Sequence, residues 1–261
     1  MPGVMGILNM TPDSFSDGGR NADPDVAFAA AQAMMAAGAA MVDIGGVSTR
    51  PRAALVSEAE ELARVGPLLD RLAGSGVPFS IDTRKASVMA RALDAGAVLV
   101  NDVSALTYDP EALGLIAERG CRVVLMHAQG TPQTMQEAPV YGDVVAEVRD
   151  WLAERIGVCV TAGVERERIV VDPGIGFGKT LEHNLTLLRG LRALHELRCP
   201  ILLGVSRKAM IWRIAGAEIN DRLPGSLALA LHGAALGVDM VRVHDVAETV
   251  QALKLWAAVS A

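Results

Sequence analysis

The sequence predicts an α/β protein that forms a single (β/α)8 TIM barrel, one domain over residues 1–261. Three observations support this prediction. Eight short runs of apolar and β-branched residues alternate with longer stretches of helical spacing, a pattern typical of a parallel sheet. A polar residue stands at or near the end of each run, with no comparable set at the starts. The length of 261 residues also suits one barrel of ordinary size.

Each apolar run is predicted to be a strand, and the segments between them to be helices. Helical spacing is clearest at Ser57–Leu72 and Leu181–Leu197, and a further helix is expected directly after Lys208. Four glycines just before strands, Gly38, Gly96, Gly120 and Gly237, are expected to end helices. A doubly wound open sheet is the alternative architecture. The predicted strands begin at Val4, Met41, Pro78, Val98, Arg122, Ile169, Ile201 and Met240.

Composition narrows the class of protein. Hydrophobic residues make up 51% of the chain and aromatic residues only 3%, which predicts a large aliphatic core. The net charge of −6 argues against binding to nucleic acid. The longest apolar stretch, from Val26 to Val42, is Ala-rich and interrupted by Gln32 and Gly38. It predicts a helix followed by a strand, because a membrane span needs ~20 strongly apolar residues. With three scattered cysteines and no signal peptide expected before Val4, we predict a cytoplasmic protein.

The polar residues at the strand ends indicate where an active site lies. In a (β/α)8 barrel the loops that follow the strands build the active site. Helix capping explains one such residue well, but it is a poor explanation for a residue at the end of every strand. The residues at or near these ends are Asn9, Asp43, Asp82, Asn101, Asp102, His127, Asp172, Ser206 and His244.

Three segments combine glycines with polar or charged residues, and three cationic or histidine side chains follow the last strands. The loop at 9–19 is long, polar and contains Phe15; the segment 45–51, GGVSTRP, supplies donors suited to an anion. Residues 172–179, DPGIGFGK, lack the spacing of a dinucleotide fingerprint or a Walker motif. Lys208, Arg242 and His244 follow the last two strands, where barrels often bind phosphate.

Asp82, Asn101 and Asp172 suit a flat heterocycle that is rich in N–H groups. The same three side chains also suit a metal ion. The sequence contains no His-x-x-x-His or Cys-pair spacing, which argues against a zinc site.

The chain resembles the dihydropteroate synthase family through nine motifs in the family's order. They extend over residues 6–245, nearly the whole chain, and together they are highly specific. The resemblance implies an enzyme that joins a dihydropterin pyrophosphate to p-aminobenzoate with Mg²⁺, in a homodimer. The motifs are GILNMTPDSFSDGG, DIGG-STRP, SIDTRK, NDVSAL, MHAQGTP, DPGIGFGK, GVSRK, RLPGS and RVHD.

The resemblance also implies roles for individual residues on the pterin pyrophosphate. Asn9 is expected to ligate Mg²⁺ on the pyrophosphate, while Arg242 and His244 hold the phosphates. Lys208 is expected to reach both substrates. The pterin is expected to contact Asp82, Asn101, Asp172, Met126 and Gly204.

For p-aminobenzoate, the resemblance implies a pocket formed by Pro51, Phe177 and Ser206. Two closing loops are expected to carry Phe15, Ser16 and Asp17 on one side and Thr49 and Arg50 on the other. Catalytic roles are implied for Lys208, Asp17 and Arg50.

The chain departs from the family pattern at Val47, Arg52, Ala209 and Trp212, where Glu, Gly, Ser and a small residue are usual. Three alternatives therefore stay open. They are a non-catalytic pterin-binding paralogue, a pterin-dependent methyltransferase domain, and a Schiff-base aldolase that uses Lys208. The apolar helix at Leu227–Leu236 is a candidate dimer face or a part of the core.

Overall fold

The strands of the protein form one parallel sheet that curls into a nearly closed barrel. The computed structural model describes residues 1–11, 23–48, 55–130, 135 and 138–260. The strand order is β6-β5-β4-β3-β2-β1-β8-β7, and a single parallel bridge between Val171 and Ile201 joins the two edges. The strands are β1 Gly3–Asn9, β2 Met41–Gly45, β3 Phe79–Asp82, β4 Leu99–Asp102, β5 Arg122–Met126, β6 Ile169–Asp172, β7 Leu202–Leu203 and β8 Met240–Val243.

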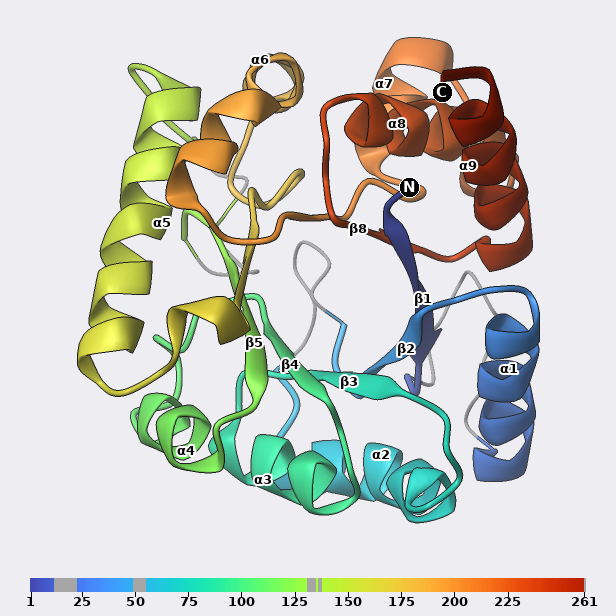
Figure 1. Ribbon diagram of the computed structural model, residues 1–261, viewed down its shortest axis with the longest axis vertical. Helices are drawn as coiled ribbons and strands as arrows, with labels where there is room; N and C mark the ends of the chain where they lie inside the picture. The colour runs from blue at the N-terminus through green and yellow to red at the C-terminus, as the bar shows by residue number, and fades with distance from the viewer. Residues whose placement is uncertain (12–22, 49–54, 131–134, 136–137, 261) are drawn as a thin grey trace.

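The helices form a ring outside the strands (Figure 1). The predicted (β/α)8 barrel is thus confirmed, and all eight predicted strands are present. Short 3-10 turns occupy Arg166–Arg168, Leu191–Leu197 and Ile219–Asp221. The helices are α1 Pro24–Ala36, α2 Glu58–Leu72, α3 Ala86–Asp94, α4 Ala112–Arg119, α5 Val144–Thr161, α6 Leu181–Arg189, α7 Ala209–Ala215, α8 Leu223–Ala235 and α9 Val246–Ser260.

Local sequence signals set the helix ends. Ser57 caps α2, where its Oγ accepts the Glu60 N–H at 3.2 Å. The four glycines predicted to end helices all have positive φ, between 57° and 99°. One prediction is wrong: the helix expected over Leu181–Leu197 ends at Arg189. The chain turns at Gly190, where a Cβ would come within 2.7 Å of Val145 in α5, and it continues as a 3-10 turn.

The main hydrophobic core lies between the strands and the surrounding helices. It includes Leu68 and Leu69 of α2, Val88 and Met89 of α3 and Ile116 of α4, all fully buried. Burial of one such side chain contributes about 1.5–3 kcal/mol. This core supplies most of the free energy that holds the helices onto the sheet.

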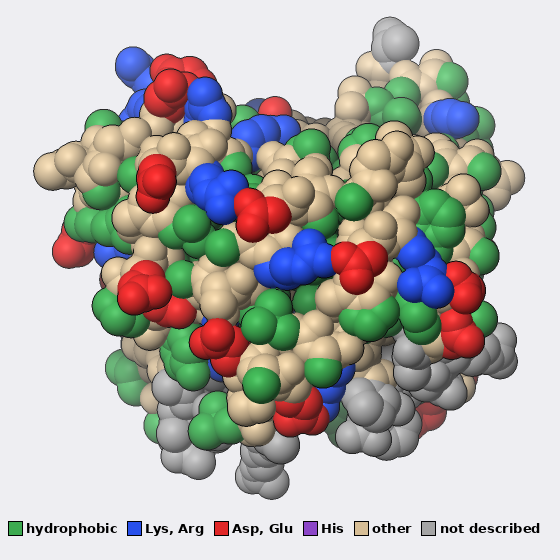
Figure 2. All heavy atoms as spheres, turned by 90° about the horizontal axis from the view of Figure 1, so that it is seen from below, with side chains coloured by type: hydrophobic (Ala, Val, Ile, Leu, Met, Phe, Trp, Pro, Cys, Tyr) green, Lys and Arg blue, Asp and Glu red, His purple; other side chains and the backbone are tan. Residues whose placement is uncertain are grey.

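The outer face of α2, α3 and α4 carries charges of both signs. Figure 2 shows the Lys and Arg side chains interspersed with Asp and Glu on that side of the molecule. Arg91 pairs with Asp70, and Arg119 pairs with Asp94 at 2.7 Å. Exposed pairs of this kind contribute at most about 1 kcal/mol each. None of the described helices has the length and apolar character that crossing a bilayer requires.

Candidate active site

The interior of the barrel is apolar at one end and polar at the other. At the amino-terminal ends of the strands it is filled by Met5, Met41, Leu99, Val124, Val170 and Leu202, with Met240 packed against them. Side chains of a strand face the same side at every second residue. The next inward positions, at the carboxyl ends, are therefore occupied by Asp43, Asn101, Met126, Asp172, Gly204 and Arg242.

Asp43 is a fully buried carboxylate surrounded by three donors. Its Oδ1 accepts a hydrogen bond from Ser80 Oγ at 2.6 Å. Its Oδ2 accepts from Asn101 Nδ2 at 3.0 Å and from Arg242 Nε at 2.6 Å. These charge-assisted bonds offset the cost of burying the carboxylate. The hydrogen bond from Nδ2 to Asp43 fixes the orientation of the Asn101 amide.

Arg242 connects two carboxylates across the barrel. Its Nη2 donates to Asp82 Oδ2 at 2.7 Å, while its Nε is held by Asp43. Burial raises the pKa of Asp82 to about 7, although the positive charge of Arg242 opposes this shift. Burial also opposes the charged form of Arg242, but the two carboxylates outweigh it and raise the pKa of the guanidinium. Arg242 therefore stays a cation at the floor of the polar end.

Asp172 and Lys208 form the opposite wall. Asp172 Oδ1 accepts the Gly174 N–H at 2.7 Å. Burial raises the pKa of Asp172, opposed by that hydrogen bond and by the charges of Lys208 and Arg242. Burial lowers the pKa of Lys208 to about 8, opposed by Asp172. The site thus places an acid at the end of β6 near a lysine after β7 that is still mostly protonated at neutral pH.

The rim after β7 and β8 adds further polar groups. Ser206 Oγ lies 3.0 Å from His244 Nδ1 and accepts the His244 N–H at 3.2 Å. Arg207 pairs with Asp245 at this rim. The Lys208 Nζ lies 4.3 Å from the centre of the Phe177 ring. These contacts bring Ser206, His244, Lys208 and Phe177 to one side of the opening.

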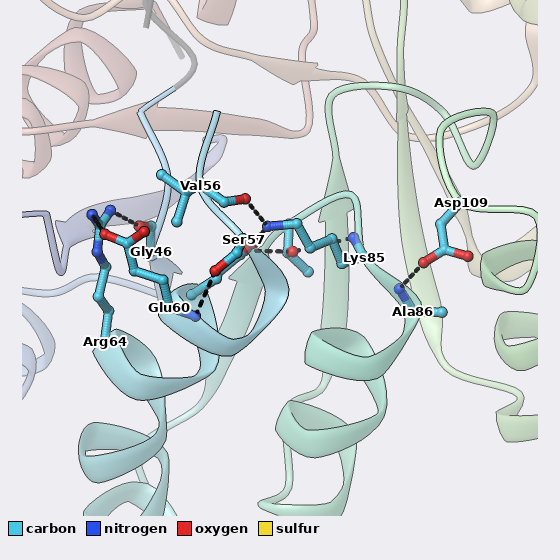
Figure 3. Close-up of polar contacts among 10 residues, drawn as sticks. Gly46, Val56, Ser57, Glu60, Arg64, Lys85, Ala86 and Asp109 are labelled. Atoms are coloured by element: carbon cyan, nitrogen blue, oxygen red, sulfur yellow. Dashed lines mark hydrogen bonds and ion pairs between the residues drawn. The ribbon is translucent and has the colours of Figure 1, made fainter. Parts of the chain in front are cut away.

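A second buried ion pair, Glu61 with Lys85, and the separate side chain of Arg64 hold the chain on the two sides of residues 49–54. Glu61 accepts from Thr83 Oγ1 and from Lys85 Nζ, both at 2.6 Å. Lys85 also donates to the Val56 carbonyl at 2.7 Å. On the other side, Arg64 Nη1 donates to the Gly46 carbonyl at 2.8 Å. Figure 3 shows Arg64 and Lys85 reaching these two carbonyls from α2 and from the start of α3.

The structure thus brings many of the predicted site residues to one end of the barrel. Asn9 lies at the same end, because it is in register with Gly45 on β2, and Gly45 is in register with Asp82 on β3. The predicted residues that the structure places there are Asn9, Asp82, Asn101, Met126, Asp172, Phe177, Gly204, Ser206, Lys208, Arg242 and His244. The remaining ones, Phe15, Asp17, Thr49, Arg50 and Pro51, and Ser16 beside them, lie outside the described residues.

The described residues contain no group of three or more His, Cys, Asp or Glu side chains arranged to hold a metal ion. Asn9 offers a neutral oxygen at the carboxyl ends of the strands. This Oδ1 lies close to Gly45 on β2, since a Cβ placed on that glycine would be 3.5 Å from it. Magnesium is commonly held by one or two protein oxygens together with substrate phosphates. The residues present fit a magnesium ion that arrives with a phosphorylated substrate.

Comparisons with known proteins agree on one family. Residues 5–244 match the family described as pterin binding enzyme. The dihydropteroate synthase of Escherichia coli K12 is 48% identical over 97% of this chain and 90% of its own. A Yersinia pestis dihydropteroate synthase, solved with a sulfonamide drug complex, superposes with a TM-score of 0.96 at 46% identity, over 99% of this chain and 94% of its own.

A third relative, the Xanthomonas albilineans dihydropteroate synthase solved with 4-aminobenzoic acid, gives a TM-score of 0.92 at 47% identity, over 100% of this chain and 93% of its own. The chain belongs to the dihydropteroate synthase family. It is a transferase of folate biosynthesis, which condenses 6-hydroxymethyl-7,8-dihydropterin pyrophosphate with p-aminobenzoate to give 7,8-dihydropteroate and pyrophosphate. The function predicted from the motifs is confirmed.

The positions that depart from the pattern of dihydropteroate synthases lie in different places. Ala209 is exposed and begins α7, and Trp212 of the same helix is 48% exposed. Val47 is partly buried beside Gly46, whereas Arg52 lies outside the described residues. Ala209 is therefore the departure that directly follows a site residue, Lys208.

Sequence reasoning missed four charged side chains around the site. Asp43 was noted as a strand-end residue but given no role, and Glu61, Lys85 and Lys179 were not singled out. Asp43 and Lys179 are at most 1% exposed, and so is Glu61. For Asp43, the apolar neighbours Val42 and Ile44 are a signal of a buried, paired charge, but the partner is not visible in the sequence. The neighbours of the other three carry no such signal.

The importance of the buried Asp43 carboxylate can be tested by unfolding in urea. Asp43→Asn keeps the shape but leaves Arg242 with one carboxylate, so we expect the free energy of unfolding to fall by about 3 kcal/mol. Asp70→Asn is the matched control, because Asp70 pairs with Arg91 at the exposed surface. There the loss should stay below about 1 kcal/mol. Equal losses in the two variants would contradict this account of the site.

Proposed function

We propose that the polar end of the barrel carries out this condensation with the residues assembled there. Asp82, Asn101 and Asp172 hold the pterin, and Met126 and Gly204 flank it. The observation that supports this most directly is the shared network of Arg242, Asp43, Asp82 and Asn101, which directs acceptor atoms and one cation into the same space.

The pterin ring presents N–H donors, and the site presents acceptors at matching positions. The Asn101 amide oxygen, the second oxygen of Asp172 and the Asp82 carboxylate are acceptors at the ends of β4, β6 and β3. A hydrogen bond from an N–H group to a carboxylate is stronger than one to a neutral oxygen. It contributes about 1.5–3 kcal/mol of binding free energy. We propose that this set selects a heterocycle with several N–H groups over one with ring oxygens.

The reaction breaks the bond between the pterin methylene carbon and the pyrophosphate oxygen and forms a bond from that carbon to the amine nitrogen. The amine then loses one proton, and negative charge collects on the leaving pyrophosphate. We propose that Arg242, His244 and Lys208 stabilise this charge, because preorganised cations act most strongly where charge develops. This role needs no nucleophilic side chain.

We propose that Asn9 contributes an oxygen ligand to Mg²⁺ on the pyrophosphate. The ion, when bound, neutralises charge on the leaving group. Asn9 is well placed for this role, because it stands at the end of β1 next to Gly45 and Asp82.

For the second substrate, we propose a pocket formed by Phe177 and Ser206 together with Pro51, with Lys208 between the two substrates. The position of the Lys208 ammonium over the Phe177 ring supports this assignment. Phe15, Asp17, Thr49 and Arg50 are assigned to the closure of the site on the strength of the family motifs alone.

We also propose that the protein works as a cytoplasmic homodimer. All three cysteines, Cys121, Cys159 and Cys199, are free thiols, which suits a reducing compartment. The apolar side chains Trp212 and Ile214 of α7 are exposed and supply apolar surface near α8.

The proposed metal role can be tested through turnover and binding. Turnover should fall to background in excess EDTA and recover with added Mg²⁺. Asn9→Ala should weaken binding of a pyrophosphate-bearing pterin by at least about tenfold, the loss expected for one bond to a charged group. A bare pterin is the control and should bind as it does to the wild-type protein. Full turnover in the chelator would refute the metal requirement.

The departure at Ala209 can be tested by restoring the usual residue. Ala209 directly follows Lys208 and has no hydroxyl, so we expect the wild-type chain to have a raised KM for p-aminobenzoate. Ala209→Ser should lower that KM by roughly threefold to tenfold, because water replaces part of the missing hydrogen bond. The KM for the pterin substrate should not change. If Ala209→Ser leaves the KM for p-aminobenzoate unaltered, Ala209 does not face the second substrate.

A further inference from the structure

The segment after β6 is a loop of glycines packed directly onto the backbone that follows β5. Gly174, Gly176 and Gly178 all have positive φ. A Cβ on Gly174 would lie 1.9 Å from the His127 carbonyl oxygen, and one on Gly178 would lie 2.3 Å from that of Gln129. The loop therefore has neither side chains nor intrinsic stiffness at these positions, and other groups must fix its shape.

Several side chains hold this loop. The Tyr141 hydroxyl donates to the Gly178 carbonyl at 2.8 Å. Asn184 Oδ1 accepts the Gly176 N–H at 2.7 Å. Lys179 makes the most contacts.

Lys179 is 1% exposed, and its Nζ donates to the Gly174 carbonyl and to the Phe177 carbonyl, each at 3.0 Å. The same Nζ lies 2.9 Å from His127 Nδ1. Burial lowers the pKa of Lys179 to about 7, opposed by the charge of Asp172. The buried Lys179 amine thus connects two points of the loop after β6 to a side chain at the end of β5.

The His127 ring is suited to accept a hydrogen bond from Lys179. Burial lowers the pKa of His127 to about 3, and the nearby charge of Lys179 acts in the same direction, so the ring is neutral. With the Lys179 Nζ as the donor, the neutral ring presents its Nδ1 lone pair to it. The Trp151 ring packs edge-on against His127, with centroids 5.1 Å apart, which fixes the plane of the imidazole.

The outer side of the loop carries the residues assigned to the substrates. Phe177 places its ring 4.3 Å from the Lys208 ammonium. Gly176 packs against the aliphatic part of the Lys208 side chain. A Cβ placed on this glycine would lie 3.3 Å from Lys208 Cδ. The position of Phe177 relative to Lys208 therefore depends on how the loop is held from behind.

We propose that Lys179, oriented by His127, is a positioning residue for the p-aminobenzoate side of the site. It acts through the Phe177 backbone and touches neither substrate. The proposal rests on the assignment of Phe177 to the p-aminobenzoate pocket. Asp172 also borders the loop, but β6 holds it through its ladder with Met126 of β5, so it depends less on Lys179.

A steady-state assay with both substrates varied tests this role. Lys179→Met keeps the length of the side chain and removes the donor, so the KM for p-aminobenzoate should rise by at least about tenfold, since small displacements of positioning groups cost that much or more. The KM for the pterin pyrophosphate should change by less than about threefold. The exposed Lys254→Met in α9 is the matched control and should leave both KM values unchanged. Equal rises in the two KM values for Lys179→Met would overturn the proposal.

A double-mutant cycle asks whether Lys179 acts through Phe177. Phe177→Leu alone should raise the KM for p-aminobenzoate. If Lys179 works by placing Phe177, the double variant should be no worse than the more severe single variant by more than about twofold. Effects that multiply would show that the two residues act separately, and the proposal would fail.

The partner residue gives a second test that does not require Lys179 variants to fold. His127→Asn keeps an oxygen acceptor near the position of Nδ1, whereas His127→Leu removes it. The asparagine variant should stay close to the wild-type KM for p-aminobenzoate, and the leucine variant should match Lys179→Met. Equal KM values in the two His127 variants would count against the proposal. Absence of turnover in the wild-type protein would instead refute the proposed function, which separates the two failures.

Discussion

The ion pair between Asp43 and Arg242 is the constraint on which the active site depends. The two side chains come from β2 and β8, the neighbours of β1 on either side, and are 199 residues apart in the chain. An unpaired carboxylate with no exposure would be strongly destabilising, so Arg242 and the donors Ser80 and Asn101 must all be in place. The orientation of the Asn101 amide and the reach of Arg242 to Asp82 both follow from this pair.

The same physical logic recurs in the shell around the site. Glu61 with Lys85 and His127 with Lys179 are buried polar pairs that act on backbone carbonyls instead of on a ligand. Loops that carry functional groups have few apolar contacts to hold them. Buried lysines that donate to loop carbonyls, Lys85 to one and Lys179 to two, supply part of the missing constraint.

Much of the fold was predictable from the sequence because it depends on periodic patterns. The apolar runs predicted all eight strands, and alternation along the strands explains why polar residues cluster at their carboxyl ends. The break of the predicted helix at Gly190 was missed, because it depends on contact with Val145 of α5. The central role of Asp43 was missed for the same reason, since its partner Arg242 is adjacent only after the barrel closes. Asp172 and Lys208 were predicted from their places at and after the strand ends, and the family motifs added their roles.

The most direct test of the central claim is the KM for the pterin pyrophosphate in Asp43→Asn, Arg242→Gln and the double variant, measured well below the unfolding transition. If Asp43 serves to place Arg242 and Asn101, each single substitution should raise this KM by at least about tenfold, and the double variant should exceed the more severe single variant by no more than about twofold. A wild-type KM in Asp43→Asn, or effects that multiply in the double variant, would contradict the account.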